Sequence, residues 1–151
     1  MRHAFVLALS LLLAACSRSS ESAPDAGRAD PQCPGGFVQG CLQEAYKAER
    51  TGDSAKAAAM YRRACDGGEA SACNRLGAMT WGGRGVPADP EAAYALYVRA
   101  CDGGDGAGCF SAAICHRTGS CAPRDEAAQK RLMARGCELK DARACAETKG
   151  R

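Results

Sequence analysis

The stretch CDGGEASAC at residues 65–73 returns as CDGGDGAGC at residues 101–109, so the same pair of cysteines recurs after 36 residues. A weaker copy, CELKDARAC, begins at Cys137, and a related stretch, CPGGFVQGC, begins at Cys33. Self-similarity with a period between about 20 and 50 residues indicates stacked supersecondary units. The sequence therefore predicts a chain built from repeats of one unit.

Each unit is predicted to contain two helices. Residues 69–81 indicate a short helix rich in small side chains, residues 82–87 a turn, and residues 89–101 a second helix. Asp89 can cap the second helix, and Pro90 stands in its first turn, where a missing amide hydrogen costs nothing. Spacings of three and four residues place one apolar stripe toward the core, formed by Ala93, Leu96, Tyr97 and Ala100.

The cysteine spacing requires the chain to turn back on itself. Eight residues of continuous helix span about 12 Å, whereas a disulfide needs α-carbons about 4.4 to 6.8 Å apart. Gly67 and Gly68, like Gly103 and Gly104, can adopt the positive φ angles that end a helix. Each bond is therefore predicted to join the last turn of one helix to the first turns of the next. The expected pairs are Cys33 with Cys41, Cys65 with Cys73, Cys101 with Cys109, and Cys137 with Cys145.

Cys115 and Cys121 flank the turn inside a repeat and are expected to form a fifth bridge. Zinc is the competing use of cysteine, but structural zinc sites favour cysteines two to four residues apart, and the chain has no Cys-x-x-Cys. We therefore expect no metal and no cofactor. Bridges of this size contribute roughly 2.5 kcal/mol each in the chain-entropy description. The chain needs this stabilisation, because aromatic residues make up only 5% of it and little apolar area can be buried.

The N-terminus has the pattern of a bacterial export signal. Residues 1–15 carry Arg2 and then an apolar run that is too short to span a membrane. LAAC at residues 13–16 resembles the lipobox of bacterial lipoproteins, in which Cys16 would receive a lipid. By the same resemblance, Ser17 after the cysteine favours the periplasmic side of the outer membrane. The alternative is ordinary cleavage that leaves Cys16 as a free thiol.

Residues 16–31 are rich in Ser, Ala, Asp and Pro and are predicted to be a flexible tether. Residues 32–151 form the predicted repeat domain, with units at about 33–64, 65–100 and 101–136 and a C-terminal cap at 137–149. Ten cysteines in a small exported domain indicate a disulfide framework and an oxidising periplasm. Without Arg2, the 20 basic residues fall by one against 17 acidic residues, a net charge of about +2. This balance gives no argument for nucleic-acid binding.

Residues 76–101 resemble the Sel1-like repeat, a relative of the tetratricopeptide repeat, and the added cysteines make the chain most similar to the Helicobacter cysteine-rich proteins. The resemblance implies an all-α fold, a right-handed α-solenoid of antiparallel helix pairs, with a concave groove that binds a protein or peptide. The residues that carry it are Leu76, Gly77, Met79, Gly83, Gly85, Val86, Asp89, Ala92, Ala93, Tyr97 and Ala100.

Helical phase selects candidate groove residues on the first helix of each unit, namely Gln43, Lys47, Asn74, Arg75, Phe110 and Ser111. The alternative for Asn74 and Arg75 is a solvated helix face. We interpret Tyr94 and Tyr97 as packing between helices, against an alternative role as ligand-binding aromatics. We expect a monomer, with an unidentified protein or peptide partner and a membrane contact through the lipid anchor.

We expect no catalytic site. Some cysteine-rich members of the family were classified as beta-lactamases, but no Ser here is followed three residues later by Lys, and RTG at residues 117–119 only faintly resembles a Lys-Thr-Gly motif. His116 is the one histidine beyond the signal, too few for a triad or a metal site. The sequence therefore favours a non-enzymatic envelope interaction module. A protein that binds or weakly hydrolyses beta-lactams is the alternative, and a purely structural role is a third possibility.

Overall fold

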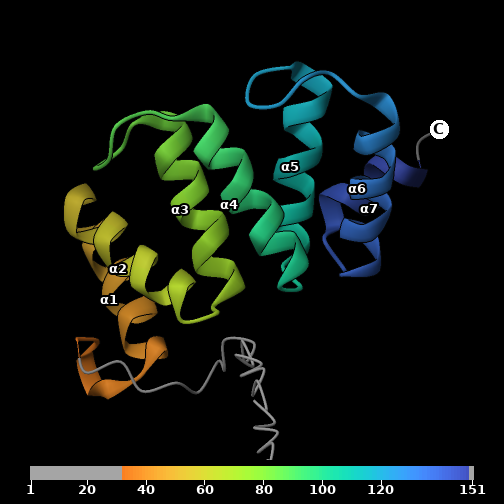
Figure 1. Ribbon diagram of the computed structural model, residues 1–151. Coiled ribbons are helices and arrows are strands. Elements are labelled where there is room, and N and C mark those ends of the chain that lie inside the picture. Colours follow the sequence, from red (N-terminus) through yellow and green to blue (C-terminus); the bar gives the residue numbers. More distant parts are fainter. Residues whose placement is uncertain (1–31, 150–151) are drawn as a thin grey trace, which may run out of the picture.

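The computed structural model describes residues 32–149, and the predicted signal peptide, tether and Cys16 lie outside this range. Consecutive helices run antiparallel in a row, so the turns lie alternately at the two ends of the helices (Figure 1). The described elements are η1 (Pro34–Gly36), α1 (Val38–Arg50), α2 (Ser54–Asp66), α3 (Ala70–Gly82), α4 (Pro90–Asp102), α5 (Gly106–Thr118), α6 (Glu126–Glu138) and α7 (Ala142–Lys149).

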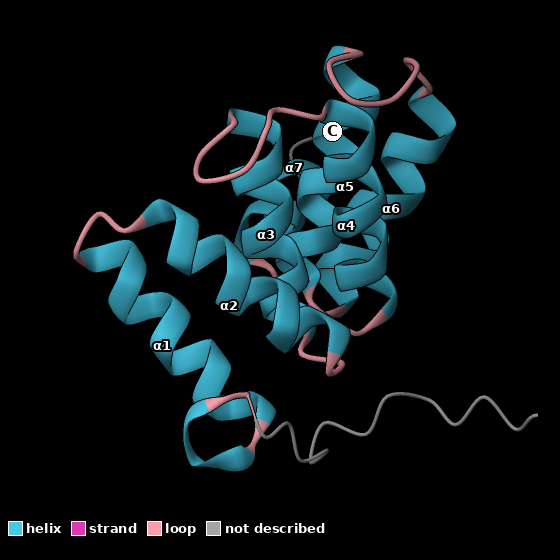
Figure 2. Ribbon diagram, turned by 60° about the vertical axis from the view of Figure 1, so that its left-hand side comes forward, coloured by secondary structure: helices cyan, strands magenta, loops and turns pink. Residues whose placement is uncertain are grey.

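Each helix packs mainly against its neighbours in the chain, as both views show (Figure 2). The first helices of successive pairs also touch, because α3 contacts α5 and α5 contacts α7. The predicted right-handed α-solenoid of antiparallel helix pairs is therefore confirmed. The helices α1, α3, α5 and α7 form one series and α2, α4 and α6 the other.

Aspartates start the second helix of every pair. The side chains of Asp53, Asp89 and Asp125 each accept a hydrogen bond, at 2.9 to 3.0 Å, from the backbone amide three residues further along. Pro90 is the first residue of α4, as its fixed φ favours. These caps set where the second helices begin, because they satisfy amides that have no partner inside the helix.

The five disulfides join the predicted pairs, with α-carbons 4.4 to 5.0 Å apart. Three of them join the end of one α-helix to the start of the next, as expected. The Cys33–Cys41 bond differs, because Cys33 precedes a short 3-10 helix and not an α-helix. Gly35 and Gly36 both have positive φ there, outside the right-handed region that an α-helix requires. The Cys115–Cys121 bond lies in the α5–α6 turn, at the opposite end of the helices from the other junctions (Figure 1).

The two glycines at each junction have different roles. The sequence predicted positive φ for both, but only the second of each pair has it. Gly68 and Gly104 have φ of 96° and 93° and turn the chain as expected. Gly67 and Gly103 keep right-handed φ of −76° and −73°. A Cβ on Gly67 would lie 2.3 Å from a methyl group of Val38. The first glycine of each pair is therefore required by close packing, and only the second by backbone conformation.

The core is built from small side chains and sulfur. The largest fully buried side chains are Tyr61, Met79, Val38 and six cysteines. Helices approach closely, since a Cβ on Gly77 of α3 would lie 2.7 Å from the ring of Tyr97 on α4. Tyr97 is 7% exposed and packs between helices as predicted. Leu96 is only partly buried, because neighbouring Ala100 and Ala93 take the central positions of the stripe.

Candidate protein-binding face

Three side-chain contacts link α1, α3, α5 and α7 in series. The guanidinium of Arg75 lies 5.7 Å from the ring centroid of Tyr46, Ser111 donates a hydrogen bond to Asn74, and Arg143 lies over the ring of Phe110. Each contact joins two neighbouring first helices. We call the surface they cross the first-helix face, formed by Gln43, Tyr46, Lys47, Asn74, Arg75, Phe110, Ser111, Ile114 and Arg143.

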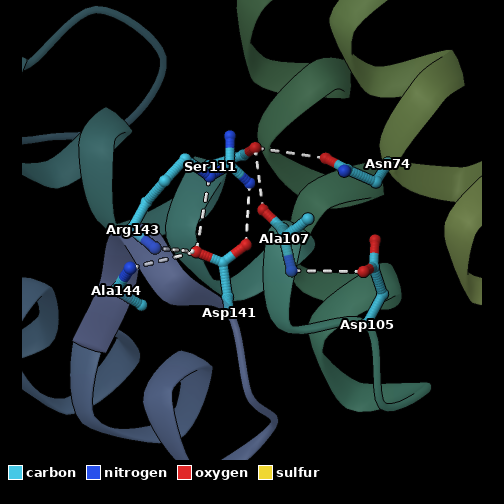
Figure 3. Close-up of polar contacts among 7 residues, drawn as sticks. All are labelled: Asn74, Asp105, Ala107, Ser111, Asp141, Arg143 and Ala144. Carbon is cyan, nitrogen blue, oxygen red and sulfur yellow. Dashed lines mark hydrogen bonds and ion pairs between the residues drawn. The ribbon is translucent and has the colours of Figure 1, made fainter. Parts of the chain in front are cut away.

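The centre of the first-helix face is polar. The hydroxyl of Ser111 donates to Oδ1 of Asn74 at 3.1 Å and lies 3.0 Å from the carbonyl oxygen of Ala107 (Figure 3). Both side chains are partly buried. The contact holds α5 against α3, and the second side-chain group of Asn74, its amide nitrogen, makes no hydrogen bond with another described residue. That nitrogen is available to donate to the backbone of a bound segment.

Arg143 at the α7 end is held in place by Asp141. Its guanidinium donates to Oδ2 of Asp141 at 2.8 Å, and its backbone amide donates to Oδ1 of the same side chain (Figure 3). The side-chain hydrogen bond from Arg143 is the main reason that the pKa of Asp141 lies below its usual value. The guanidinium also lies 4.4 Å from the ring centroid of Phe110, within the range of a cation–π contact.

A small apolar recess of about 240 Å³ lies next to this contact. It is lined chiefly by Trp81, Tyr97, Phe110 and Ile114, with the Cys115–Cys121 bridge at its edge. Trp81 is 51% exposed, which is unusual for so large an apolar side chain. We call this the apolar recess; it offers aromatic and aliphatic surface to a partner side chain of moderate size.

A second recess, of about 450 Å³, lies at the α1 end. Gln43, Tyr46, Lys47, Arg50 and Thr51 line it. Tyr46 is 37% exposed and packs edge-on against the buried Tyr61, with ring centroids 5.7 Å apart. We call this the cationic recess, because both of its charged side chains are basic.

All six groove residues selected from the sequence lie on first helices, at the first-helix face. Gln43 and Lys47 line the cationic recess, while Phe110 and Ser111 line the apolar recess. Asn74 is engaged with Ser111, and Arg75 is exposed beside Tyr46. The alternative of a solvated helix face fits Arg75, which is exposed, better than Asn74, whose side chain is partly buried. Binding by these residues stays a prediction.

The sequence reasoning missed Tyr46, Trp81, Ile114 and Arg143. Tyr46 and Ile114 occupy equivalent positions, five residues after the second cysteine of their units, where α3 carries Ala78. A comparison of the three units at that position could have found them. Arg143 could not have been found this way, because its position is taken by Ala107 and Ser71 in the preceding units.

Asp105 begins α5 with one satisfied oxygen and one unsatisfied oxygen. Its Oδ1 accepts from the amide of Ala107 at 3.1 Å (Figure 3), whereas Oδ2 is buried and has no hydrogen-bond partner among the described residues. Burial raises the pKa of this carboxyl above its usual value. In the preceding unit Ser71 donates to the equivalent Glu69 at 2.7 Å, and Ala107 stands where that serine would be. Asp105 therefore lacks the hydroxyl donor that its counterpart Glu69 has.

Tyr94 and His116 form a fixed pair beside the within-repeat turns. The ring nitrogen Nδ1 of His116 must donate to the carbonyl oxygen of Pro123, 2.8 Å away, because that oxygen can only accept. The other ring nitrogen lies 2.8 Å from the hydroxyl of Tyr94, and the two rings meet edge-on. Both nitrogens of His116 are therefore engaged in holding α4, α5 and the turn at Pro123 together. Tyr94 packs between helices through this contact.

Within residues 32–149, no group of three or more His, Cys, Asp or Glu side chains is arranged to hold a metal ion. Over the same range, none of the helices has the length and apolar character needed to cross a bilayer.

Comparison with known proteins identifies the repeats. The Sel1 repeat matches residues 45–69 and 70–105. A Sel1 repeat protein from Oxalobacter formigenes has a similar structure, with a TM-score of 0.71 and 22% identity, covering 76% of this chain and 47% of that chain. A protective antigen of uropathogenic Escherichia coli strains, which displays an SLR fold, has a TM-score of 0.70 and 18% identity, covering 76% of this chain and 26% of that one.

Helicobacter pylori cysteine rich protein B has a TM-score of 0.59 and 20% identity, covering 72% of this chain and 92% of that chain. No curated protein matches the chain. The chain spans about half the length of the Oxalobacter protein and about a quarter of the Escherichia coli antigen. At these identities the structural likeness establishes the fold.

Proposed function

We propose that this chain, which carries Sel1 repeats, is a non-enzymatic protein-binding module of the bacterial cell envelope and that it binds a protein or peptide along the first-helix face. The observation that carries the proposal is the series of contacts from Tyr46 to Arg143, which joins the first helices into one continuous surface with a recess toward each end. Sel1 repeat proteins generally bind other proteins.

The cysteines support the envelope location. All ten cysteines of residues 32–149 are paired, and six of them are among the largest fully buried side chains. Disulfides persist in oxidising compartments such as the periplasm and are rare in reducing cytosol. A core that depends on sulfur bridges fits an exported protein. Anchoring through a lipid on Cys16, on the periplasmic side of the outer membrane, is part of this proposal.

The proposal is tested by photocrosslinking in intact cells that express the full chain. A photoreactive amino acid at Gln43, an exposed residue of the first-helix face, should give a discrete adduct with a partner protein. The matched control carries the same amino acid at Arg62, an exposed residue of α2. Adducts of equal yield from both positions, or from neither, would contradict binding at the first-helix face.

No contact in the structure favours the beta-lactam alternative. No serine among residues 32–149 is hydrogen-bonded to a lysine or a histidine, and Ser111 bonds only to Ala107 and Asn74. Incubation with a fluorescent penicillin tests this alternative directly. Stoichiometric covalent labelling that disappears in one Ser→Ala variant would favour the enzyme over the interaction module.

A further inference from the structure

The charged side chains around the cationic recess have one sign. Lys47 and Arg50 line the recess, and Arg75 reaches over the ring of Tyr46 from the neighbouring helix α3. Among the described residues, no carboxylate forms an ion pair with any of these three cations. These three cations therefore have no ion-pair partner among the described residues.

The two glutamates of α1 have their hydrogen-bond and ion-pair partners outside the cationic recess. Glu44 pairs with Lys56 of α2, and its pKa is lowered mainly by the hydrogen bond from that lysine. Glu49 accepts a hydrogen bond from the hydroxyl of Tyr61 at 2.7 Å and lies 3.7 Å from Arg84. The charge of Lys47 also lowers the pKa of Glu44, but the two do not form an ion pair. Both acids of α1 thus make their direct contacts with α2 and the α3–α4 turn, and the cations Lys47 and Arg50 line the recess.

At the other end of the first-helix face the cations are paired with carboxylates, and the surface is apolar. Arg143 is neutralised by Asp141, and Arg117 pairs with Glu147 at 3.0 Å. Next to Arg143 the apolar recess presents the exposed indole of Trp81 beside Phe110 and Ile114. The first-helix face therefore offers cations without an ion-pair partner at one end and apolar surface at the other.

We propose that the partner of the first-helix face is an extended acidic protein segment that carries one large apolar side chain. Its carboxylates pair with Lys47, Arg50 and Arg75, and its apolar side chain enters the apolar recess. Neighbouring packed helices lie about 8 to 10 Å apart, and an extended chain advances about 3.3 to 3.6 Å per residue. The recess on α1 and the recess at α5 are two such steps apart, about 16 to 20 Å, so the acidic and apolar residues of the segment are separated by roughly four to six residues. This inference rests on the proposed function and specifies the partner's chemistry.

The probe is a synthetic peptide of about twelve residues with three consecutive glutamates and one leucine four residues away, made in both sequence orders and labelled with fluorescein. Binding to the disulfide-bonded repeat domain is followed by anisotropy. Trp81 is the only tryptophan of the chain, so its emission reports independently on whether the leucine occupies the apolar recess. We expect one sequence order to bind and to shift the Trp81 emission.

Charge-reversed variants locate the site. The double variant Lys47→Glu/Arg75→Glu should weaken binding at least about tenfold at low salt, because attractive contacts become repulsive. Arg62→Glu/Arg131→Glu, which reverses two exposed charges on α2 and α6, is the matched control and should change the affinity less than about twofold. Replacing the leucine of the peptide by serine should abolish the Trp81 shift. Circular dichroism on both variants establishes that the helices are intact.

The acidic partner and protein binding at the first-helix face can fail independently. Failure of both peptides to bind, while the crosslink from Gln43 persists in cells, would overturn the acidic partner and leave the protein-binding function standing. Equal binding by heparin or by polyglutamate lacking leucine would also overturn the inference, since it would show a general polyanion site. Loss of the crosslink as well would overturn both.

Discussion

The carboxylate of Asp105 accepts a hydrogen bond from the backbone amide of Ala107 with one oxygen, while its other oxygen is buried without a partner. Asp125, in contrast, caps α6 in solvent, and the hydrogen bond from Ala128 is the main reason its pKa is lowered. Two aspartates with the same capping role thus have opposite pKa shifts, because burial dominates at one and hydrogen bonding at the other. Opposite dependences of stability on pH follow.

Asp105→Asn should be neutral or stabilising at pH 7, by up to about 1 kcal/mol, because asparagine caps helices well and carries no charge into a buried site. The raised pKa of Asp105 means that its stabilising contribution is present below pH 3.8 and is lost as pH rises through the folded value. The advantage of the variant should therefore grow with pH. Asp125→Asn is the control: it should lose stability at neutral pH, and the loss should shrink as pH falls below 3.8, because the pKa of Asp125 is lowered in the folded protein. Urea unfolding at several pH values measures both.

Lys140→Gly should stabilise the domain by roughly 0.5 to 1 kcal/mol. Lys140 has φ of 65°, at the position that Gly68 and Gly104 occupy in the earlier junctions. A left-handed backbone costs a residue with a Cβ about 1 to 2 kcal/mol, and the entropy cost of glycine recovers only part of the difference. The reverse change, Gly104→Lys, should destabilise by a similar amount. A lower thermal midpoint for Lys140→Gly would contradict the assigned conformation.

Gly67→Ala should destabilise by about 1 to 3 kcal/mol, because its Cβ would lie 2.3 Å from a methyl group of Val38. Gly82→Ala is the matched control within a helix. Its Cβ would meet nothing nearer than Arg84 at 3.8 Å, and a gain of about 0.4 to 1 kcal/mol is expected. Adding Val38→Ala to Gly67→Ala should recover part of the loss. Chemical unfolding of the wild type, Gly67→Ala, Val38→Ala and the double variant measures the coupling.

Replacing Cys101 and Cys109 together by alanine should lower the free energy of unfolding by about 2.5 kcal/mol, because a cross-link restricts the unfolded chain. The Cys115 and Cys121 double variant should lose a similar amount, since its loop is only slightly shorter. Denaturant unfolding without reductant gives both values. A decrease in the free energy of unfolding of less than about 0.5 kcal/mol would show that the helix packing is stable without the bridges.

Cys16→Ala should move the protein from the membrane fraction to the soluble periplasmic fraction. Two or more acyl chains anchor a protein stably, whereas their removal leaves only the repeat domain. Mass spectrometry of the native N-terminal peptide should find a lipidated cysteine. An unmodified Cys16 thiol in that peptide would favour ordinary signal cleavage.

Local features of the fold were predictable because the residues that cause them lie close together in the chain. The second cysteine of each pair is eight residues from the first, so a turn suffices to bring them together. The aspartate caps act over three residues, and the 36-residue period assigns the helix pairs. These signals predicted stacked helix pairs and the five bridges, whereas the right-handed solenoid and its groove were implied by the resemblance to the Sel1-like repeat. Two details differed: Gly35 and Gly36 prevent an α-helix after Cys33, and Gly67 and Gly103 keep right-handed φ.

Contacts between repeats were decided by the tertiary structure. Whether Arg143 lies over Phe110, whether Gly67 faces Val38, and whether the second oxygen of Asp105 finds a donor all depend on how far each helix pair is rotated and displaced relative to the previous one. That displacement is the sum of many small packing contacts, spread over residues more than thirty positions apart. No short pattern encodes it, so the sequence by itself determined the unit, and only the packed stack determined the surface that the units form together.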